Sequence, residues 1–296
     1  MKLNLNFSYC PVCTGNTQLW RSKTVNGVIY DICACENCHF GFVNPRPNYE
    51  DLQLYYSSQI HKGLVPKTLE EVLQSEVDYP NATVDAKRII SFLKKMLKST
   101  GNLLDVGCGC GIFSKEAIDH GFAVTAIEAA DSERCIARQM IGIDPIAIPF
   151  EEFEPNISFN AILMSQVLEH SADPMLWLRK ANKLLNIGGA IAIAVPNFSS
   201  LFDLFLKEKS PFVSPPEHLN FFNEHNLYIA LEKSGFKVCC SYTVSRLPKN
   251  TIVKKLPLLL PLGIPLNIFQ EMLTKSMDYV NMGMFVNIFA SKAKEI

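Results

Sequence analysis

The chain has 296 residues, of which 48% are hydrophobic and 19% charged, a composition that suits one medium globular domain with a smaller attachment and argues against extensive disorder. Its formal net charge is −1, so there is no overall positive field to attract nucleic acid or anionic lipid. The N-terminal residues lack the continuous apolar run of a secretory signal. We therefore expect a cytoplasmic protein whose ten cysteines are thiols or metal ligands rather than disulfides.

Residues 1–47 contain two Cys-x-x-Cys motifs separated by about 20 residues, formed by Cys10, Cys13, Cys35 and Cys38. This spacing predicts a structural zinc site in a zinc-ribbon-like module, because a bound metal supplies folding energy that so short a segment cannot obtain from a core. Cys33 and His39 lie beside the second motif and are expected to be bystanders, because four ligands already complete a zinc site.

Residues 48–82 are expected to form a linker with helical segments, and the apolar spacing of residues 84–98 predicts an amphipathic helix. Short β-rich runs then alternate with helical patterns, which predicts an α/β fold with a Rossmann-like, doubly wound parallel sheet. The expected strands are 102–106, 122–127, 161–164, 190–195, 236–244 and 284–290, and the expected helices are 112–120, 132–141, 174–185 and 226–234.

Residues 245–282 are predicted to be an insertion between the last two strands. Within it, residues 256–269 form an apolar run that prolines interrupt and that is too short to span a membrane. A buried helical lid and a contact with a membrane surface or a partner are both consistent with this run.

The strand at 102–106 leads into a turn with alternating glycines, Gly107, Gly109 and Gly111. Its spacing departs from the dinucleotide fingerprint and from the Walker loop. Asp105 at the mouth of the turn would repel a pyrophosphate but attract an ammonium group. Glu128 ends the next strand, where an acid accepts hydrogen bonds from two ribose hydroxyls. An amino acid joined to a nucleoside, as in S-adenosylmethionine (SAM), offers an ammonium group to Asp105 and ribose hydroxyls to Glu128.

A resemblance to class I SAM-dependent methyltransferases rests on the segments LLDVGCGCGIF, AVTAIEAA and FNAILMSQVLEHSADPMLWLRKANKLLNIGGAIAIAVPN. It covers about residues 84–244 and the last strand, so that 83–296 would be the methyltransferase domain. The resemblance implies a role in cofactor binding for Asp105, Gly107, Gly109, Gly111, Glu128, Glu151 and Gln166. Cys108 and Cys110, between the glycines, are interpreted as buried inert thiols.

The N-terminal segment resembles the zinc-binding module of some bacterial methyltransferases, including C-methyltransferases of nucleotide-linked deoxysugars. By that resemblance His218 is the candidate base and Glu217 an orienting or substrate-binding carboxylate. A loop-anchoring role for His218 is an equally open alternative. The pair Glu169-His170 resembles one that is largely architectural in methyltransferases of varied acceptors. The chain lacks the large further domain of the C-methyltransferases, so O-methylation is at least as well supported as C-methylation.

The sequence therefore predicts SAM-dependent methylation of a small-molecule or saccharide acceptor. One alternative is an RNA methyltransferase whose zinc ribbon binds the substrate, against which the near-neutral charge argues. Another is a non-catalytic protein that binds SAM or metal and serves in interactions.

Overall fold

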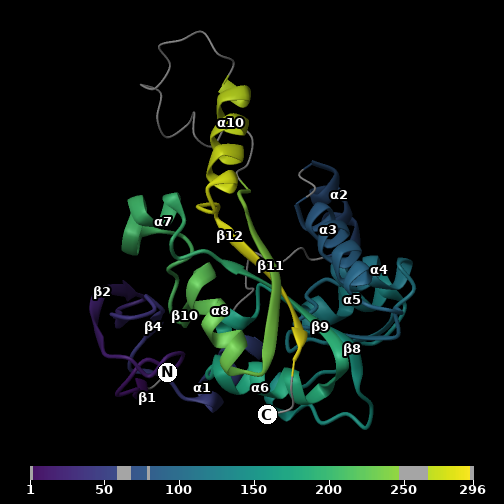
Figure 1. Cartoon of the computed structure of the whole chain (residues 1–296), viewed down its shortest axis with the longest axis horizontal. Coiled ribbons are helices and arrows are strands. Elements are labelled where there is room, and N and C mark those ends of the chain that lie inside the picture. Colours follow the sequence, from purple (N-terminus) through teal and green to yellow (C-terminus); the bar gives the residue numbers. More distant parts are fainter. Residues whose placement is uncertain (1–2, 59–67, 79–80, 247–265, 294–296) are drawn as a thin grey trace.

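The computed structural model describes residues 3–58, 68–78, 81–246 and 266–293. Its centre is a six-stranded sheet of order β11-β12-β9-β8-β6-β7, which crosses the body of the protein in Figure 1. Four neighbouring strands are parallel, and β12 and β11 extend the sheet in antiparallel fashion. The predicted α/β class with a mostly parallel sheet is thus confirmed. The strands are β6 (Asn102–Val106), β7 (Ala123–Ile127), β8 (Phe159–Ser165), β9 (Leu185–Pro196), β11 (Phe236–Val244) and β12 (Phe285–Lys292).

Helices alternate with these strands close to the predicted positions. Local signals set where the helices begin. At the start of α6 (Pro174–Leu184), the Asp173 side chain accepts a hydrogen bond from the backbone N–H of Leu176 at 2.9 Å, and Pro174 is the first residue of the helix. Asn223 and Asn226 form a reciprocal capping box at the start of α8. The helices are α3 (Asn81–Met96), α4 (Ile112–Asp119), α5 (Asp131–Ile141), α6 (Pro174–Leu184) and α8 (Glu224–Lys233).

The sheet is apolar on both faces because successive side chains of a strand point to opposite sides. Leu103 and Leu163 join a core with the apolar residues of α3 and α4. Leu104 and Ile162 join a second core with the residues of α6 and α8. Cys10, Cys35 and Cys38 belong to that second core, so the cysteine-rich segment packs on the α6 and α8 side.

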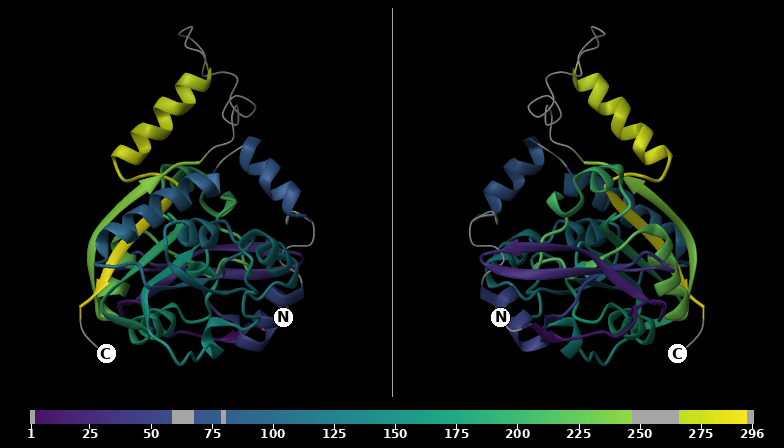
Figure 2. Two further views of the ribbon diagram at one scale, coloured as in Figure 1. Left: turned by 90° about the vertical axis from the view of Figure 1, so that its right-hand side faces the viewer. Right: turned by 90° about the vertical axis from the view of Figure 1, so that its left-hand side faces the viewer.

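A smaller antiparallel sheet of order β10-β4-β3-β2 contains most of the N-terminal strands. Its strands are β2 (Thr17–Val25), β3 (Val28–Cys35), β4 (Gly41–Val43) and β10 (Asn220–Phe221), while β1 (Leu3–Leu5) pairs with β5 (Arg46–Pro47). Figure 2 shows the β2–β3 hairpin, in purple, against the body of the protein. The predicted domain boundaries at residues 47 and 82 stay a prediction. Strand β10, which belongs to this small sheet, comes from a part of the sequence well after both boundaries.

The remaining elements lie around the core. Helix α10 lies between β11 and β12, inside the predicted insertion, and projects from the body in Figures 1 and 2. Most of the apolar run 256–269 lies outside the described residues, so its role stays a prediction. Among the described helices, none combines the length and apolar character needed to cross a membrane. The elements are α1 (Tyr49–Ser58), α2 (Leu69–Asp78), α7 (Leu201–Leu206), α10 (Leu266–Tyr279) and the short turns η1 (Phe150–Glu152), η2 (Leu168–His170) and η3 (Lys207–Lys209).

A buried arginine ties the smaller sheet to the loop that follows β8. Arg46 is fully buried, and its Nη1 donates to the carbonyl oxygen of Ala172 at 2.7 Å and to Oδ1 of Asn220 at 3.2 Å. Its guanidinium also lies over the Phe7 ring at 4.8 Å. Asn220 in turn donates from Nδ2 to the carbonyl oxygen of Ser171 at 2.7 Å. The two side chains therefore satisfy polar groups from three distant parts of the chain.

Replacing Asn220 by alanine removes one of the two acceptors of Arg46 Nη1 and the donor to the carbonyl oxygen of Ser171, both in a buried setting. We expect the free energy of unfolding to fall by about 2 kcal/mol or more, because buried polar groups lose their partners. Urea denaturation measures the change. Asn186→Ala, at an exposed position, is the control and should change stability by less than about 0.5 kcal/mol. Similar small losses in both variants would contradict this account.

Candidate functional site

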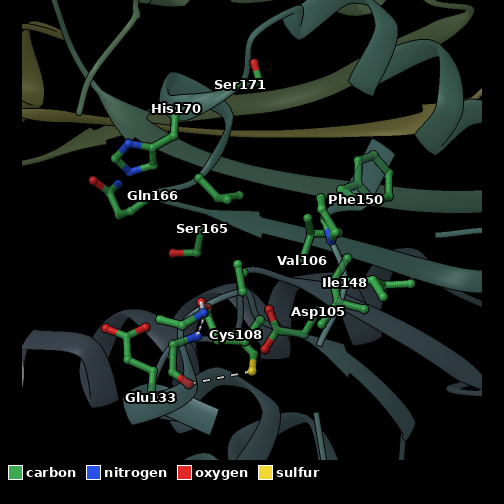
Figure 3. A pocket seen from close by; sticks show the side chains of 18 of the residues that line it. Asp105, Val106, Cys108, Glu133, Ile148, Phe150, Ser165, Gln166, His170 and Ser171 are labelled. Carbon is green, nitrogen blue, oxygen red and sulfur yellow. Dashed lines mark hydrogen bonds between the residues drawn. The ribbon is translucent and has the colours of Figure 1, made fainter. Parts of the chain in front are cut away.

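A cavity of about 840 Å³ lies where β6, β7 and β8 end. The carboxyl ends of parallel strands meet at one edge of a sheet, so the loops that leave them converge there. Figure 3 shows Asp105 and Glu133 on one side of the cavity and Gln166 and His170 across from them. Residues of α1 also line it, which places the segment after the cysteine module beside the site.

The glycine loop after β6 needs glycine for both conformation and space. Gly107 has φ +67°, and a Cβ on it would lie 2.7 Å from Cγ2 of Val167. Gly111 has φ +89°, and a Cβ there would lie 3.3 Å from the Cα of Ala137 in α5. Residues with a Cβ rarely adopt such φ values. The loop therefore runs close against the residues after β8 and against α5, with its backbone facing the cavity.

Asp105 is buried at the floor of the cavity, with 2% of its surface exposed. The Ser114 hydroxyl donates to its Oδ2 at 2.6 Å. Burial, with a smaller contribution from the charge of Glu128, raises the pKa of Asp105 to about 7. A positively charged group in the cavity would stabilise the ionised carboxylate and lower this pKa.

Glu128 holds the glycine loop against the end of β7. The backbone N–H of Gly109 donates to its Oε2 at 2.9 Å, and that of Ala130 donates to its Oε1 at 2.9 Å. Each carboxylate oxygen retains a second lone pair for a further donor. This geometry suits a pair of neighbouring hydroxyl groups, the role predicted for Glu128.

Two features of the loop region bear on the sequence analysis. Glu133 also lines the cavity, and burial raises its pKa to about 7. Sequence reasoning did not single out Glu133, because an acid in the first turn of a helix is a common surface residue.

The two cysteines of the glycine loop are also affected by burial, which raises the pKa of Cys110 to about 12 and raises that of Cys108 as well. Neither thiol forms a reactive thiolate near neutral pH, which supports the interpretation of both as inert thiols.

The far wall of the cavity carries the two remaining predicted cofactor residues. Glu151 lines it beside Phe150, whose ring contacts Trp177 edge-on with 5.1 Å between centroids. Gln166 lines it with a left-handed backbone, φ +55°, which the hydrogen bond from its N–H to the carbonyl oxygen of Ala194 at 2.7 Å helps to hold. Such conformations in non-glycine residues cluster at functional sites.

The structure separates the predicted pair Glu217 and His218. Glu217 lines the cavity together with His170, whereas His218 lines a separate, much smaller cavity. The rings of His170 and His218 meet edge-on with 5.0 Å between centroids. Burial lowers the pKa of His218 to about 4, so its imidazole is neutral at physiological pH. His170, which the sequence analysis treated as architectural, is the histidine that faces the cavity.

All four predicted metal ligands come together in the N-terminal module. The Sγ atoms of Cys10 and Cys38 lie 3.6 Å apart, and those of Cys13 and Cys35 lie 3.3 Å apart. All four are free thiols, and the four sulfur atoms lie within 4.8 Å of one another. Backbone N–H groups point at the sulfurs, as from Cys13 to Cys10 at 3.5 Å. This donor set fits a tetrahedral zinc ion, which four thiolates hold at about 2.3 Å.

Comparison with known proteins identifies related sequences over the central part of the chain. The model of a family described as "Methyltransferase domain" matches residues 80–241. A ubiquinone biosynthesis O-methyltransferase from Caulobacter vibrioides is 37% identical over 102 residues, which are 32% of this chain and 40% of that protein. The match thus spans about two fifths of that relative's length.

Solved structures share the fold at low sequence identity. A SAM-dependent methyltransferase from Archaeoglobus fulgidus aligns with a TM-score of 0.51 and 17% identity over 75% of this chain and 99% of its own. Magnesium protoporphyrin IX methyltransferase from Synechocystis, solved with bound SAH, aligns with a TM-score of 0.52 and 11% identity over 83% of this chain and 100% of its own. At these identities the likeness concerns the fold alone.

The raised pKa of Asp105 predicts a dependence of stability on pH. An acid whose pKa rises from 3.8 to about 7 on folding binds its proton more tightly in the folded protein. Stability is therefore lost as pH rises from about 4 to about 7. In the cofactor-free protein we expect Asp105→Asn to reduce this loss by about 2–4 kcal/mol, measured by urea denaturation at several pH values. Parallel profiles for the variant and the wild type would contradict the assignment.

Proposed function

Because this chain belongs to the methyltransferase-domain family, we propose that it transfers the methyl group of SAM to a small-molecule acceptor. The observation that carries the proposal is the pairing of Asp105 and Glu128 on either side of the glycine loop, at one end of the 840 Å³ cavity. SAM supplies an electrophilic methyl group on a sulfonium, together with an ammonium group, a carboxylate and a ribose diol. Each of these polar parts has a complementary group here.

The roles of the cofactor residues follow from their positions. Asp105 would face the ammonium group, whose charge would stabilise the buried carboxylate. The start of α4 would direct its backbone N–H groups towards the carboxylate, because those of Gly107, Gly109 and Gly111 already donate within the protein. Glu128 would accept from the ribose hydroxyls, and Glu151 and Gln166 on the far wall would flank the rest of the cofactor.

The acceptor would occupy the end of the cavity that His170 and Glu217 line. Methyl transfer is an in-line displacement, so positioning of donor and nucleophile supplies much of the rate. We favour a hydroxyl acceptor, because the relatives that match include ubiquinone biosynthesis O-methyltransferases, with a carbon acceptor or a saccharide as variants of the same reaction. A hydroxyl must lose its proton, and His170 and Glu217 provide polar groups at this end.

Glu128→Gln tests the cofactor site. A carboxamide has only one acceptor oxygen, so it leaves either Gly109 or Ala130 without a hydrogen-bond acceptor and turns an N–H towards that group. We expect the affinity for SAM and for S-adenosylhomocysteine to fall about tenfold or more, measured by calorimetry. Glu232→Gln, at an exposed position on α8, should bind both with unchanged affinity. Absence of binding by the wild type would overturn the proposed function.

Transfer itself is measured with SAM labelled in the methyl group. We expect the wild type to label small molecules from a metabolite extract, and Glu128→Gln to label them at least about tenfold more slowly at low cofactor concentration. Mass analysis of the product identifies the atom that carries the label. Label found only in RNA or protein would contradict a small-molecule acceptor.

We propose in addition that the cluster of Cys10, Cys13, Cys35 and Cys38 holds a structural zinc ion. The ion would hold together β3, the turn at Cys10 and the residues that lead into β4. Asn226 supports the same region by donating to the carbonyl oxygen of Cys38 at 3.4 Å.

Cobalt reports on this site because thiolate ligands give Co²⁺ an intense charge-transfer band in the near ultraviolet. We expect the wild type to show this band, and Cys13→Ser to bind the metal about 100-fold or more weakly because it loses one of four ligands. Cys239→Ser, at an exposed cysteine outside the cluster, is the matched control and should retain the band. An unchanged band in Cys13→Ser would contradict the assignment.

A further inference from the structure

Three side chains of types that bind metals in other proteins meet beside His170, at the wall of the cavity. A carboxylate oxygen of Glu169 and one ring nitrogen each of His170 and His218 all lie within 4.8 Å of one another. Glu169 and His170 come from η2, directly after β8, and His218 comes from the loop before β10. This cluster is separate from the four cysteines.

The Glu169 carboxylate is buried, with 1% of its surface exposed. Among the described residues, neither of its oxygens has a hydrogen-bond partner. A buried carboxylate without a partner is strongly unfavourable, so the site requires a positive charge or a proton there. The nearest polar atoms that the cluster offers are the two imidazole nitrogens, which suggests a cation held jointly by all three side chains.

Both imidazoles are oriented in the way that metal-binding histidines usually are. The Nδ1–H of His170 donates to the carbonyl oxygen of Glu217 at 2.7 Å. The Nδ1–H of His218 donates to the carbonyl oxygen of Phe212 at 2.7 Å. Because a carbonyl only accepts, Nδ1 carries the proton in each ring and Nε2 carries the lone pair. Metal-bound histidines commonly donate their second N–H to a carbonyl or carboxylate in this manner.

We propose that Glu169, His170 and His218 bind a divalent transition-metal ion at the wall of the cavity. Two imidazoles and one carboxylate favour zinc, cobalt, manganese or iron over magnesium and calcium, which prefer oxygen ligands alone. Binding would draw the three ligand atoms in to about 2.1 Å from the ion. Since His170 lines the cavity, an ion bound to it would lie at the cavity wall.

This site deepens the proposed function, on which its catalytic role rests. An ion there would bind the acceptor hydroxyl directly and lower its pKa, which leaves an oxygen nucleophile facing the methyl donor. The proton would pass to water in the open cavity, and no redox change is involved. The role expected for His218 on sequence grounds, removal of the acceptor's proton, would then be performed by the ion that His218 helps to hold.

Titration of the metal-free full chain with Co²⁺ tests the inference, because the two sites have different spectra. The cysteine site gives thiolate charge-transfer absorption, whereas a site of nitrogen and oxygen ligands adds only weaker visible bands. We expect two equivalents to bind, the second without thiolate absorption. In Glu169→Gln and His218→Gln the second equivalent should bind about 100-fold or more weakly, and His225→Gln, at an exposed histidine of α8, should retain both.

A wild-type chain that binds one equivalent, all of it with thiolate absorption, would overturn the inference. Retention of the second equivalent by Glu169→Gln would do the same. The thiolate band of each variant, with its affinity for S-adenosylhomocysteine, reports whether the variant is folded. The number of bound metal ions is measured without any turnover, so the two proposals can fail separately. Methyl transfer by a chain that binds no second metal ion would contradict this site alone. Binding of a second metal ion by a chain that does not bind the cofactor would contradict the proposed function alone.

Discussion

The parallel alignment of β6, β7 and β8 is the constraint on which the site depends. Their carboxyl ends lie at one edge, so Asp105, Glu128 and Gln166 converge although they are far apart in the sequence. Because β6 lies between the other two strands, Asp105 at its end is buried, and its pKa rises. The same crowding requires glycine in the loop, since a Cβ on Gly107 would meet Val167.

The acceptor end depends on a different part of the chain. Strand β10 follows His218 closely and pairs with β4, so the position of the histidine is linked to the N-terminal sheet. Arg46 and Asn220 fix the same junction from inside, and Lys23 of β2 donates to the carbonyl oxygen of Val213. The segment that carries the cysteine cluster thus supports one wall of the candidate active site, and a zinc ion bound there would stabilise that wall.

The sequence predicted the central sheet well because its signals are local, and signals of the same kind pointed to the glycine loop and the acids that the structure places at one cavity. Apolar runs alternate with amphipathic segments, and the acidic and glycine residues stand at fixed places in one strand–turn–helix unit. The meeting of the four cysteines was predictable for the same reason, since both motifs are short and spaced like a known metal site.

The acceptor end was not predictable in detail, because it depends on packing between distant segments. Sequence favoured His218, but the loop before β10 turns that ring behind His170, so that His170 faces the cavity. The pairing of β4 with β10 could not be predicted from a pattern in the sequence either. Strands of two or three residues have no measurable periodicity, and their partners lie at opposite ends of the chain.

That pairing also bears on how the protein is made. During synthesis the cysteine motifs and the β2–β3 hairpin leave the ribosome before β10, so the small sheet can be completed only after Asn220 and Phe221 have emerged. Until then β4 has a free edge, which is prone to pairing with other chains. Early capture of a metal by the four cysteines would hold the N-terminal segment in shape through this interval.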